Sequence, residues 1–591
     1  MRMSICTVAW RAHRVCLCET MLWPVRRGAY IASPSGPCPA CTRTPVAPIR
    51  KDLPMNKLVS RRTAGALALS LLAATTAALA APAGEAGPPQ RGGQLIVALR
   101  AEPVLLNPLV DQGSGAHSVR PVLDSLVWDN GDGSYDPWLA ERWEISADAK
   151  VYTFHLRRDV KFHDGTPFNA EAVKANFDFI ANPANKSTGS TAKLKPVARV
   201  VDAYTLEVTL GTPESSFLTL IAAPYFGIIS KQQLEQDPKS LSSKLIGTGP
   251  FKFDRWVKGQ SLSYVRNDAY NWAPPKFHRG TAYVDSVRYV FLPEDQTRYN
   301  ALLTGEAHVV DYIPPEHAKT VKAGKYQTSE FLLPGVGYSL HLNTRKPPFD
   351  QKEVRLALLA GLDRAGIASA ASFGAYPAQE YLATTTPDFA KNLKNRIRHD
   401  PKRAGELLDA AGWTQRDAQG YRTKDGKRLS TASPYADNDQ LAQRTLEQVQ
   451  VDARKLGIEI QLQPVTATDL AQRLYNGNYG ILGSFQSEAT GMQLWRLYGS
   501  DNISDGSTVG SNASFLSIPE LDAVLAKARS SGKAADRARY YAEAQEILPN
   551  FAPSVPLYTR GRLVAAQSNV HGVSWDKAWP QPYLFDAWIA K

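Results

Sequence analysis

Two cysteines of the chain, Cys38 and Cys41, have the CxxC spacing that can hold a metal ion through thiolates or form a redox-active disulfide. The other three cysteines, Cys6, Cys16 and Cys18, also precede residue 55, and none follows it. One such pair in a proline-rich leader does not by itself make a site. Disulfides, thiolate metal sites and thiol catalysis are therefore excluded from the main body of the chain, residues 81–591.

Sequence motifs of known catalytic mechanism are absent. There is no HExxH zinc motif, no GxSxG nucleophile elbow, no P-loop and no GxGxxG after an apolar strand. Serine, histidine and aspartate occur without the spacing that indicates a triad. An exported enzyme, the main alternative class, is thus left without a candidate catalytic residue. We predict a protein without catalysis, cofactor or metal.

The positive charge of the chain is concentrated at its beginning. The net charge is +12, and residues 1–80 carry eleven Lys or Arg and two Asp or Glu. Nine of the twelve charges therefore lie there, and residues 81–591 are close to neutral, with no dense stripe of Lys or Arg. Nucleic-acid binding, which depends on concentrated positive charge, loses its main support.

The sequence around residues 55–80 has the order of an export signal. A basic stretch that begins at Met55 and contains Arg61 and Arg62 is followed by an apolar run that ends at Ala80 in Ala-Leu-Ala. A basic region, an apolar region and a small-residue cleavage site are typical of a cleaved signal peptide. The run is shorter than the roughly 20 residues of a membrane span. We expect export to the periplasm by the Sec or the twin-arginine route.

Residues 1–54 fit poorly in front of an export signal. They are rich in Cys, Arg and Pro and have no clear periodicity. We interpret them as a non-native upstream extension, with Met55 as the native start and residues 55–80 as the signal peptide. No cysteine follows the apolar run, which argues against a lipid-anchored protein.

The main body mixes the patterns of strands and helices. We predict strands at 94–99, 151–156, 204–210, 251–253, 284–291 and 458–462 from apolar runs or alternation. Helical spacing predicts helices at 119–128, 170–180, 353–362, 401–411, 439–456 and 536–548, with Asn169 as one N-cap. No period of 20–50 residues recurs, so a repeat protein is not indicated. The predicted fold class is α/β.

Short motifs follow one another in a fixed order along residues 92–591. They include Ala140-Glu141-Arg142-Trp143, Val160-Lys161-Phe162-His163-Asp164-Gly165-Thr166-Pro167-Phe168, Gly247-Thr248-Gly249-Pro250, Pro348-Phe349-Asp350 and Ala411-Gly412-Trp413. In this combination the chain resembles the family 5 extracellular solute-binding proteins of ABC transporters. That family includes oligopeptide-, dipeptide- and nickel-binding proteins.

The resemblance implies a two-lobed periplasmic binding protein fold, similar to class II, with an extra subdomain in the first lobe. The ligand cleft would lie between the lobes and would close by a hinge motion. The implied boundaries are 81–137, 246–343 and 556–591 for lobe I, 138–245 for its extra subdomain, and 344–555 for lobe II.

The resemblance also suggests where the ligand binds. The segment from Ile481 to Glu488 is typical of a buried strand that runs into a polar loop. In peptide-binding relatives a carboxylate near this place resembles the anchor for the α-amino group of the ligand, and Glu488 is its nearest match here. Pairing of a buried carboxylate with an ammonium group is a physically reasonable device for specificity.

Two departures argue against a metal-chelate ligand. Nickel-binding relatives have a histidine about where Gln486 stands, and their ligand-binding arginine falls near Phe226. Tyr225 and Phe226 would suit an apolar wall of the cleft or ordinary core packing. His117, in a loop after the first strand, is a further candidate, as are Trp495 and Arg496.

The resemblance implies a periplasmic solute-binding protein that captures a peptide or similar polar solute and delivers it to an ABC permease and ATPase complex in the inner membrane. We expect a monomer that binds no nucleic acid. The alternatives are a binding protein for an opine-like amino-acid conjugate or a metal chelate, an exported hydrolase, and a binding protein that serves a chemoreceptor or holds peptides as a chaperone.

Overall fold

The computed structural model describes residues 87–591 apart from 111–115, 188, 505–509 and 580. These residues belong to one compact unit that begins at Pro82. The predicted upstream extension 1–54 and signal peptide 55–80 lie outside the described residues. Among the helices of the described part, none is both long enough and apolar enough to cross a membrane.

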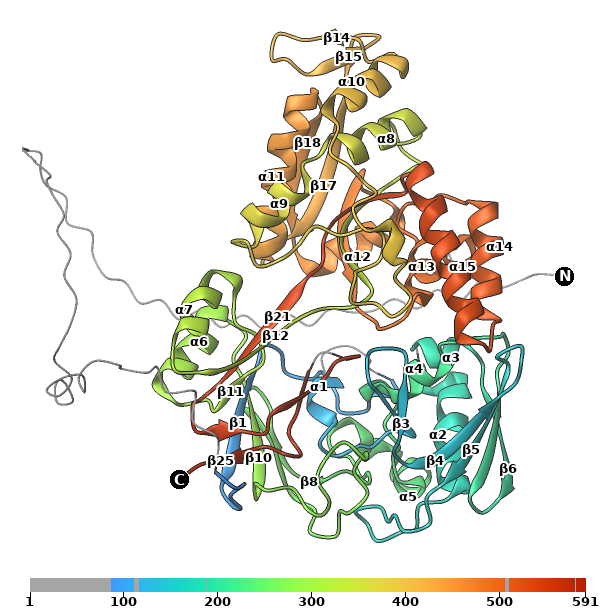
Figure 1. Ribbon diagram of the computed structural model, residues 1–591, viewed down its shortest axis with the longest axis vertical. Coiled ribbons are helices and arrows are strands. Elements are labelled where there is room, and N and C mark those ends of the chain that lie inside the picture. Colours follow the sequence, from blue (N-terminus) through green and yellow to red (C-terminus); the bar gives the residue numbers. More distant parts are fainter. Residues whose placement is uncertain (1–86, 111–115, 188, 505–509, 580) are drawn as a thin grey trace, which may run out of the picture. The chain divides into compact units, whose positions relative to one another are not determined.

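A mixed seven-stranded sheet joins the beginning of the described chain to a segment near its end (Figure 1). The strand predicted at 94–99 is confirmed as β1, which lies parallel to two neighbours, whereas the other pairs are antiparallel. In order across the sheet the strands are β12 (Gln327–Leu332), β21 (Gly561–Ala566), β11 (Val309–Val310), β1 (Gln94–Leu99), β10 (Ser286–Phe291), β9 (Ser261–Arg266) and β8 (Phe251–Val257).

Strand β1 contributes to two hydrophobic cores because successive side chains of a strand point to opposite faces. Leu95, Val97 and Leu99 belong to a large core that extends through residues 95–291 and includes residues near the C-terminus. Ala98 belongs to a smaller core with Leu302, which packs the helices α6 (Asp295–Thr304) and α7 (Ala318–Ala323) against the other face.

A four-stranded antiparallel sheet follows β1 in the sequence. Its order is β4 (Ala140–Ile145), β5 (Val151–Leu156), β7 (Thr205–Thr209) and β6 (Val197–Asp202). The alternation predicted at 151–156 is confirmed, since Tyr152, Phe154 and Leu156 are buried. Helix α2 (Ala170–Ala181) covers this sheet, and Asn169 caps it by accepting a hydrogen bond from the Ala172 amide at 3.0 Å.

The segment 119–128 is not the helix that its apolar spacing predicts. Helix α1 (Ala116–Val119) ends at Val119, and the chain becomes strand β2 (Val127–Asp129) after an irregular stretch. Pro121 cannot donate the backbone hydrogen bond of a helix. Its carbonyl and that of Val122 instead accept hydrogen bonds from Phe251 and Gly249, both at 2.9 Å. The apolar side chains of residues 119–128 are all buried, so their spacing does not mark one buried face of a helix.

A second set of elements surrounds a separate core. The fully buried strand β13 (Val336–Leu342) lies between β19 (Ile481–Gln486) and β20 (Ser554–Tyr558), and β17 (Ser430–Ala436) pairs in parallel with β18 (Glu459–Val465). The helices predicted in this region are confirmed within one or two residues as α8 (Lys352–Gly361), α10 (Pro401–Ala410) and α11 (Gln440–Leu456), joined by α9 (Arg364–Ala371). Asp439 is the N-cap of α11 and accepts from the Ala442 amide.

Four further helices follow: α12 (Ala467–Asn476), α13 (Met492–Tyr498), α14 (Pro519–Arg529) and α15 (Ala534–Ile547). A core that contains Leu494, Leu525 and Tyr541 packs the last three together. The helix predicted at 536–548 is confirmed as α15, two residues longer at its start and one shorter at its end.

The remaining elements are short and connect the larger ones. They are β3 (Tyr135–Pro137), η1 (Pro183–Asn185), α3 (Ser190–Lys193), α4 (Phe217–Ala222), η2 (Pro224–Phe226), α5 (Lys231–Gln236), η3 (Pro238–Ser242), η4 (Pro315–His317), η5 (Lys391–Leu393), β14 (Gln415–Arg416), β15 (Arg422–Lys424), β16 (Lys427–Arg428), η6 (Ser500–Asn502), η7 (Leu548–Asn550), β22 (Val570–His571), β23 (Ser574–Asp576), β24 (Gln581–Tyr583) and β25 (Trp588–Ile589).

Candidate functional site

Glu488 follows the end of β19 by two residues, in a loop held against the start of β13. Gln486 pairs with Val336, and Gly335 precedes that pair with a φ of +93°. A Cβ at position 335 would come within 2.4 Å of the Gln486 carbonyl oxygen and 2.8 Å of the Glu488 amide nitrogen. Only glycine accepts both the positive φ and this close approach. The backbone of the loop is therefore fixed where Glu488 begins.

The Glu488 carboxylate is buried and has few partners. Its Oε2 accepts a hydrogen bond from the Gln493 amide, and the Arg496 Nη1 lies 4.0 Å from the same oxygen. Its Oε1 accepts no hydrogen bond from the described residues, although the residue is only 3% exposed. A buried carboxylate normally has several donors. One of its oxygens is thus available to a donor that the described chain does not supply.

Burial raises the pKa of Glu488 from 4.5 to about 7. The positive charge of Arg496 opposes this shift, while the negative charges of Glu214 and Asp129 add to it. Loss of water disfavours the ionised carboxylate, and a cation 4.0 Å away offsets that cost only in part. A ligand that brings an ammonium group would favour the ionised form.

Helix α13 supplies both groups that face Glu488. Gln493 and Arg496 are three residues apart and therefore lie on one face of this helix. Trp495 projects differently, and the guanidinium carbon of Arg529 lies 3.7 Å from its ring centroid. Arg529 in turn donates from Nε to the Glu214 carboxylate at 2.8 Å. The helix thus carries the two partners of Glu488 and a cation–π contact side by side.

Glu488 lines a cavity of about 200 Å³. The walls come from three distant segments of the chain: Ser190, Thr191, Leu220, Ala223 and Tyr225 from one, Gln486, Ser487, Glu488 and Arg496 from another, and Trp579 from a third. The rings of Tyr225 and Trp579 meet edge to face with centroids 5.0 Å apart. A polar ligand here would touch all three segments at once.

A second cavity of about 200 Å³ adjoins the first and shares the walls Ser190, Leu220 and Arg496. Its other lining residues are Lys193, Leu194, Thr212, Met492, Trp495, Asp501, Asn502 and Arg529. Apolar side chains and cations are mixed in this lining. Arg496 is the charged residue that both cavities have in common.

The structure brings together five of the seven residues proposed from the sequence. Glu488, Gln486, Tyr225 and Arg496 line the first cavity, and Trp495 lines the second. Their binding role stays a prediction, because the structure holds no ligand.

Of the two roles considered for Phe226, cavity wall and core packing, the structure shows core packing. Its side chain is 1% exposed, packs on Phe177 with ring centroids 4.7 Å apart, and lines neither cavity. Tyr225 and Phe226 belong to the 3₁₀ turn η2, in which successive side chains point about 120° apart, so one faces the cavity and the other the core. His117 belongs to α1, and its side chain lies outside the described part of the chain.

Sequence reasoning missed several lining residues. Ser190, Lys193 and Trp579 belong to segments without a recognisable motif. Gln493, the partner of Glu488, lines neither cavity but carried one usable signal, since a residue three positions before Arg496 on a helix shares its face. The others are brought together only by the fold.

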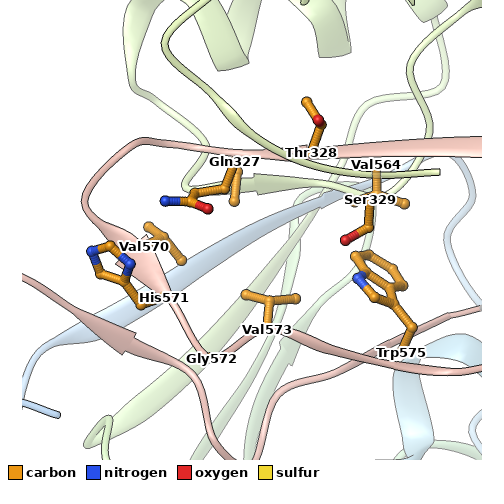
Figure 2. A pocket seen from close by; sticks show the side chains of 10 residues that line it. Gln327, Thr328, Ser329, Val564, Val570, His571, Gly572, Val573 and Trp575 are labelled. Atoms are coloured by element: carbon orange, nitrogen blue, oxygen red, sulfur yellow. The ribbon is translucent and has the colours of Figure 1, made fainter. Parts of the chain in front are cut away.

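Two other cavities lack a buried carboxylate. One, of about 130 Å³, lies beside β12, β21 and β22, and Figure 2 shows His571 and Trp575 at opposite ends of it. Its only titratable lining residue is His571. A larger cavity of about 620 Å³ has several charged walls, but its acidic residues are exposed or half-buried, and Arg444 pairs with Glu316 at 3.8 Å. Solvated carboxylates are weaker candidates for selective pairing than Glu488.

Comparison with known families settles the class of protein. Residues 134–500 match the model of the bacterial extracellular solute-binding proteins, family 5. The chain belongs to this family. The predicted family and the two-lobed α/β fold are confirmed, and the family is one of binding proteins.

The glutathione-binding protein GsiB of Escherichia coli (strain K12) is 29% identical over 449 residues, which cover 73% of this chain and 82% of GsiB. Two solved structures have similar folds. DppA of Helicobacter pylori, an ABC transporter-associated periplasmic binding protein in complex with the peptide STSA, is 26% identical with a TM-score of 0.70, and the match covers 85% of this chain and 99% of DppA. NikA of Brucella suis, in complex with Fe(III)-EDTA, is 25% identical with a TM-score of 0.73, and the match covers 84% and 100%.

The described residues contain no group of three or more His, Cys, Asp or Glu side chains that could hold a metal ion. Two pairs of opposite charge lie at the two cavities, Glu488 with Arg496 at 4.0 Å and Glu214 with Arg529 at 2.8 Å. Such pairs recognise charged organic ligands through charge-assisted hydrogen bonds.

Proposed function

We propose that this family 5 protein captures a peptide or a similar small polar solute in the periplasm and delivers it to the permease of an ABC importer. The observation that carries the proposal is the buried Glu488 carboxylate, which lines a cavity and to which the described residues offer only Gln493 and a cation at 4.0 Å, both at the same oxygen. The ammonium group of a ligand would complete its pairing.

The mechanism that we propose is capture by closure. The first cavity has walls from residues 190–225 and from residues 486–496, so a ligand there contacts both the proposed subdomain 138–245 and the proposed lobe II, 344–555. Contacts that exist only when both sides meet the ligand favour the closed state. The remaining proposed parts, 81–137, 246–343 and 556–591, would form the body of lobe I.

The relatives support a ligand with a free amine. GsiB is named for glutathione, and DppA holds the peptide STSA. NikA holds Fe(III)-EDTA, so the family fold also accommodates a metal chelate. The incompletely paired Glu488 carboxylate favours a ligand with an amine, such as a peptide or an amino-acid conjugate, for this chain.

We propose further that translation starts at Met55, that the signal peptide 55–80 is cleaved, and that the mature protein is a monomer without catalysis, cofactor or nucleic-acid ligand. Intact-mass analysis of the protein from a periplasmic fraction tests the first two points. A mass that matches a chain beginning at Ala81 is expected. Retention of any residue from 1–54 would overturn the proposed start.

The binding experiment is a thermal-shift screen of the purified exported protein, followed by calorimetry. The ligands are di- to pentapeptides, opine-like amino-acid conjugates and nickel with histidine. A ligand at about 100 times its Kd adds about 2.7 kcal/mol to the free energy of unfolding, so a true ligand raises the Tm visibly. We expect peptides or amino-acid conjugates with a free amine to do so, and their N-acetylated forms to fail.

The matched variants are Glu488→Gln and Glu543→Gln. Glu543 is an exposed residue of α15 that lines neither cavity, so its change controls for the loss of one negative charge. Glu488→Gln should reduce the shift strongly and Glu543→Gln should keep it. Binding of N-acetylated and free ligands with equal affinity would refute the anchor, and turnover of any ligand would refute a pure binding role.

A further inference from the structure

Three charged side chains, Glu488, Arg496 and Lys193, lie where the two cavities adjoin, and we call this group the seam. Glu488 lines the first cavity, Arg496 lines both, and Lys193 lines the second. The Arg496 Nη1 lies 4.0 Å from the Glu488 Oε2, which is longer than a normal charge-assisted hydrogen bond. The seam thus presents a carboxylate and a guanidinium that are close to each other but incompletely paired.

Arg496 and Lys193 are not neutralised by the anion that lines the second cavity, because no ion pair among the described residues joins either of them to Asp501. No carboxylate among the described residues forms an ion pair with Lys193, and loss of water around its ammonium group and the positive charge of Arg496 both lower the pKa of Lys193. The third cation of the second cavity, Arg529, is already engaged by Glu214 at 2.8 Å. Arg496 and Lys193 therefore attract a negative group from a ligand, next to the place where Glu488 attracts a positive one.

The spacing of these groups restricts the ligand. In an α-amino acid the nitrogen and the carboxylate carbon are joined through one carbon and lie about 2.5 Å apart. A single head group of this kind can place its ammonium on Glu488 and its carboxylate on Arg496, which are themselves 4.0 Å apart. In an ordinary α-linked peptide the position beside the terminal amine is a neutral amide, and the nearest carboxylate is on a side chain or at least one residue away.

We propose that the ligand presents a free α-amino-acid head group, with ammonium and carboxylate on one carbon, to the Glu488–Arg496 pair beside Lys193. The preferred substrates are then peptides linked through a side chain, such as γ-glutamyl peptides, and α-linked peptides bind less tightly. The rest of the ligand extends along the first cavity past Gln486, Tyr225 and Trp579. This inference rests on the proposed binding function and specifies the ligand of the same site.

Two isomeric dipeptides test it by calorimetry on the exported protein. γ-Glutamylglycine and α-glutamylglycine have the same composition and net charge and differ in whether a carboxylate shares a carbon with the amine. We expect the γ isomer to bind at least about 30-fold more tightly, the size expected when one partner of a buried charge pair is lost. Amidation of the α-carboxylate of the γ isomer should remove this advantage.

The matched variants are Arg496→Gln and Arg539→Gln. Arg496→Gln should reduce the preference for the γ isomer to a few-fold, and Lys193→Gln should reduce it partly. Arg539, an exposed cation of α15, lies outside both cavities, so its change should leave the preference intact. If Arg496→Gln does not fold, Arg496→Lys replaces it and should weaken the preference, because lysine lacks the two-pronged guanidinium.

The outcomes separate the two proposals. Equal or tighter binding of the α isomer, or binding of other peptides but of neither isomer, would overturn the head-group inference and leave the peptide-binding function standing. Failure of every peptide and conjugate of the wider screen would overturn the proposed function itself. An isomer preference that survives Arg496→Gln and Lys193→Gln would also overturn the inference, since the preference would then arise elsewhere.

Discussion

Two buried glutamates, Glu214 and Glu488, lie near each other but have opposite surroundings. The Glu214 carboxylate is fully enclosed, and it accepts hydrogen bonds from the Arg529 Nε at 2.8 Å and from the amide and hydroxyl of Ser216 at 3.1 and 2.6 Å. Glu488 has one hydrogen bond, from Gln493, and a cation at 4.0 Å. The described chain supplies hydrogen-bond donors to both oxygens of the Glu214 carboxylate but to only one oxygen of the Glu488 carboxylate.

We interpret the fully paired Glu214 as a residue that stabilises the fold and the incompletely paired Glu488 as a residue that binds the ligand. A buried carboxylate with all its donors supplied stabilises the contact in which it takes part, here between residues 214–216 and α14, where Ser215 also donates to the carbonyl groups of Arg529 and Ala528. An incompletely paired carboxylate costs stability until a ligand supplies the missing charge. The two are coupled, because the negative charge of Glu214 raises the pKa of Glu488.

The largest effect is expected when the complete pair is broken. Glu214→Gln leaves the Arg529 guanidinium, whose side chain is 13% exposed, without its anionic partner. Loss of one partner of a buried ion pair should lower the free energy of unfolding by about 3 kcal/mol, the lower end of the usual range. Urea denaturation measures it, with Glu543→Gln as the control. A change no larger than that of the control would show that the two glutamates do not differ as argued.

The same substitution at the incomplete site should act on binding instead. Glu488→Gln removes a buried negative charge without stranding a tightly bound cation, so the ligand-free protein should be as stable as the wild type or more stable at pH 8. Affinity for an amine-bearing ligand should fall at least about 30-fold, which corresponds to about 2 kcal/mol. Urea denaturation measures the stability of this variant, and calorimetry measures its affinity for the ligand. A loss of stability in Glu488→Gln as large as that in Glu214→Gln would contradict the distinction between the two glutamates.

The pH dependence should have opposite signs with and without ligand. The pKa of Glu488 is about 7 in the folded protein and 4.5 ordinarily, so its stabilising contribution is complete below pH 4.5 and is lost as the pH rises through 7. Burial is the main cause of this raised pKa; the charge of Arg496 opposes the shift, and the charges of Glu214 and Asp129 add to it. Ligand affinity should instead rise through pH 7 as Glu488 ionises and fall above about pH 8 as the ligand amine loses its proton.

The difference between wild type and Glu488→Gln isolates this contribution. The pKa of Asp129 is also raised to about 7 by burial, so the wild-type stability profile contains more than one carboxyl. Denaturation from pH 4 to pH 8 should give curves for the two proteins that diverge between pH 4.5 and 7. Parallel curves would contradict the assignment of the shift to Glu488.

The smallest effects distinguish the cavity wall from the core. Tyr225→Leu removes the edge-to-face contact with Trp579 and a ligand-facing ring, which should cost about 1 kcal/mol of binding free energy and little stability. Phe226→Leu should do the reverse and lower the free energy of unfolding by about 1 kcal/mol, because that ring packs on Phe177. Calorimetry measures the affinity of both variants, and thermal denaturation measures their stability. If both substitutions lowered the affinity equally, Phe226 would also have to contact the ligand.

Elements that depend on neighbouring residues were predicted correctly from the sequence, whereas a segment that depends on distant contacts was not. The strand at 151–156 and the helix capped by Asn169 depend on alternation and capping within a few residues, and both were predictable. The segment 119–128 was mispredicted because its apolar spacing results from contacts with residues 249–251, more than a hundred positions away. Of the candidate site, Gln486 and Glu488 were accessible because the resemblance to family 5 points to the loop after the strand that begins at Ile481.

The sequence by itself determined the family, the mixed α/β class and the absence of thiol chemistry after residue 54, since these depend on composition and ordered motifs. Only the tertiary structure decided which carboxylates are satisfied. Glu214 and Arg529 are 315 positions apart, and no local pattern joins them. Electrostatic pairing depends on distances in space, and the fold alone sets these distances. The fold also decides that Tyr225 lines the cavity while its neighbour Phe226 is buried in the core.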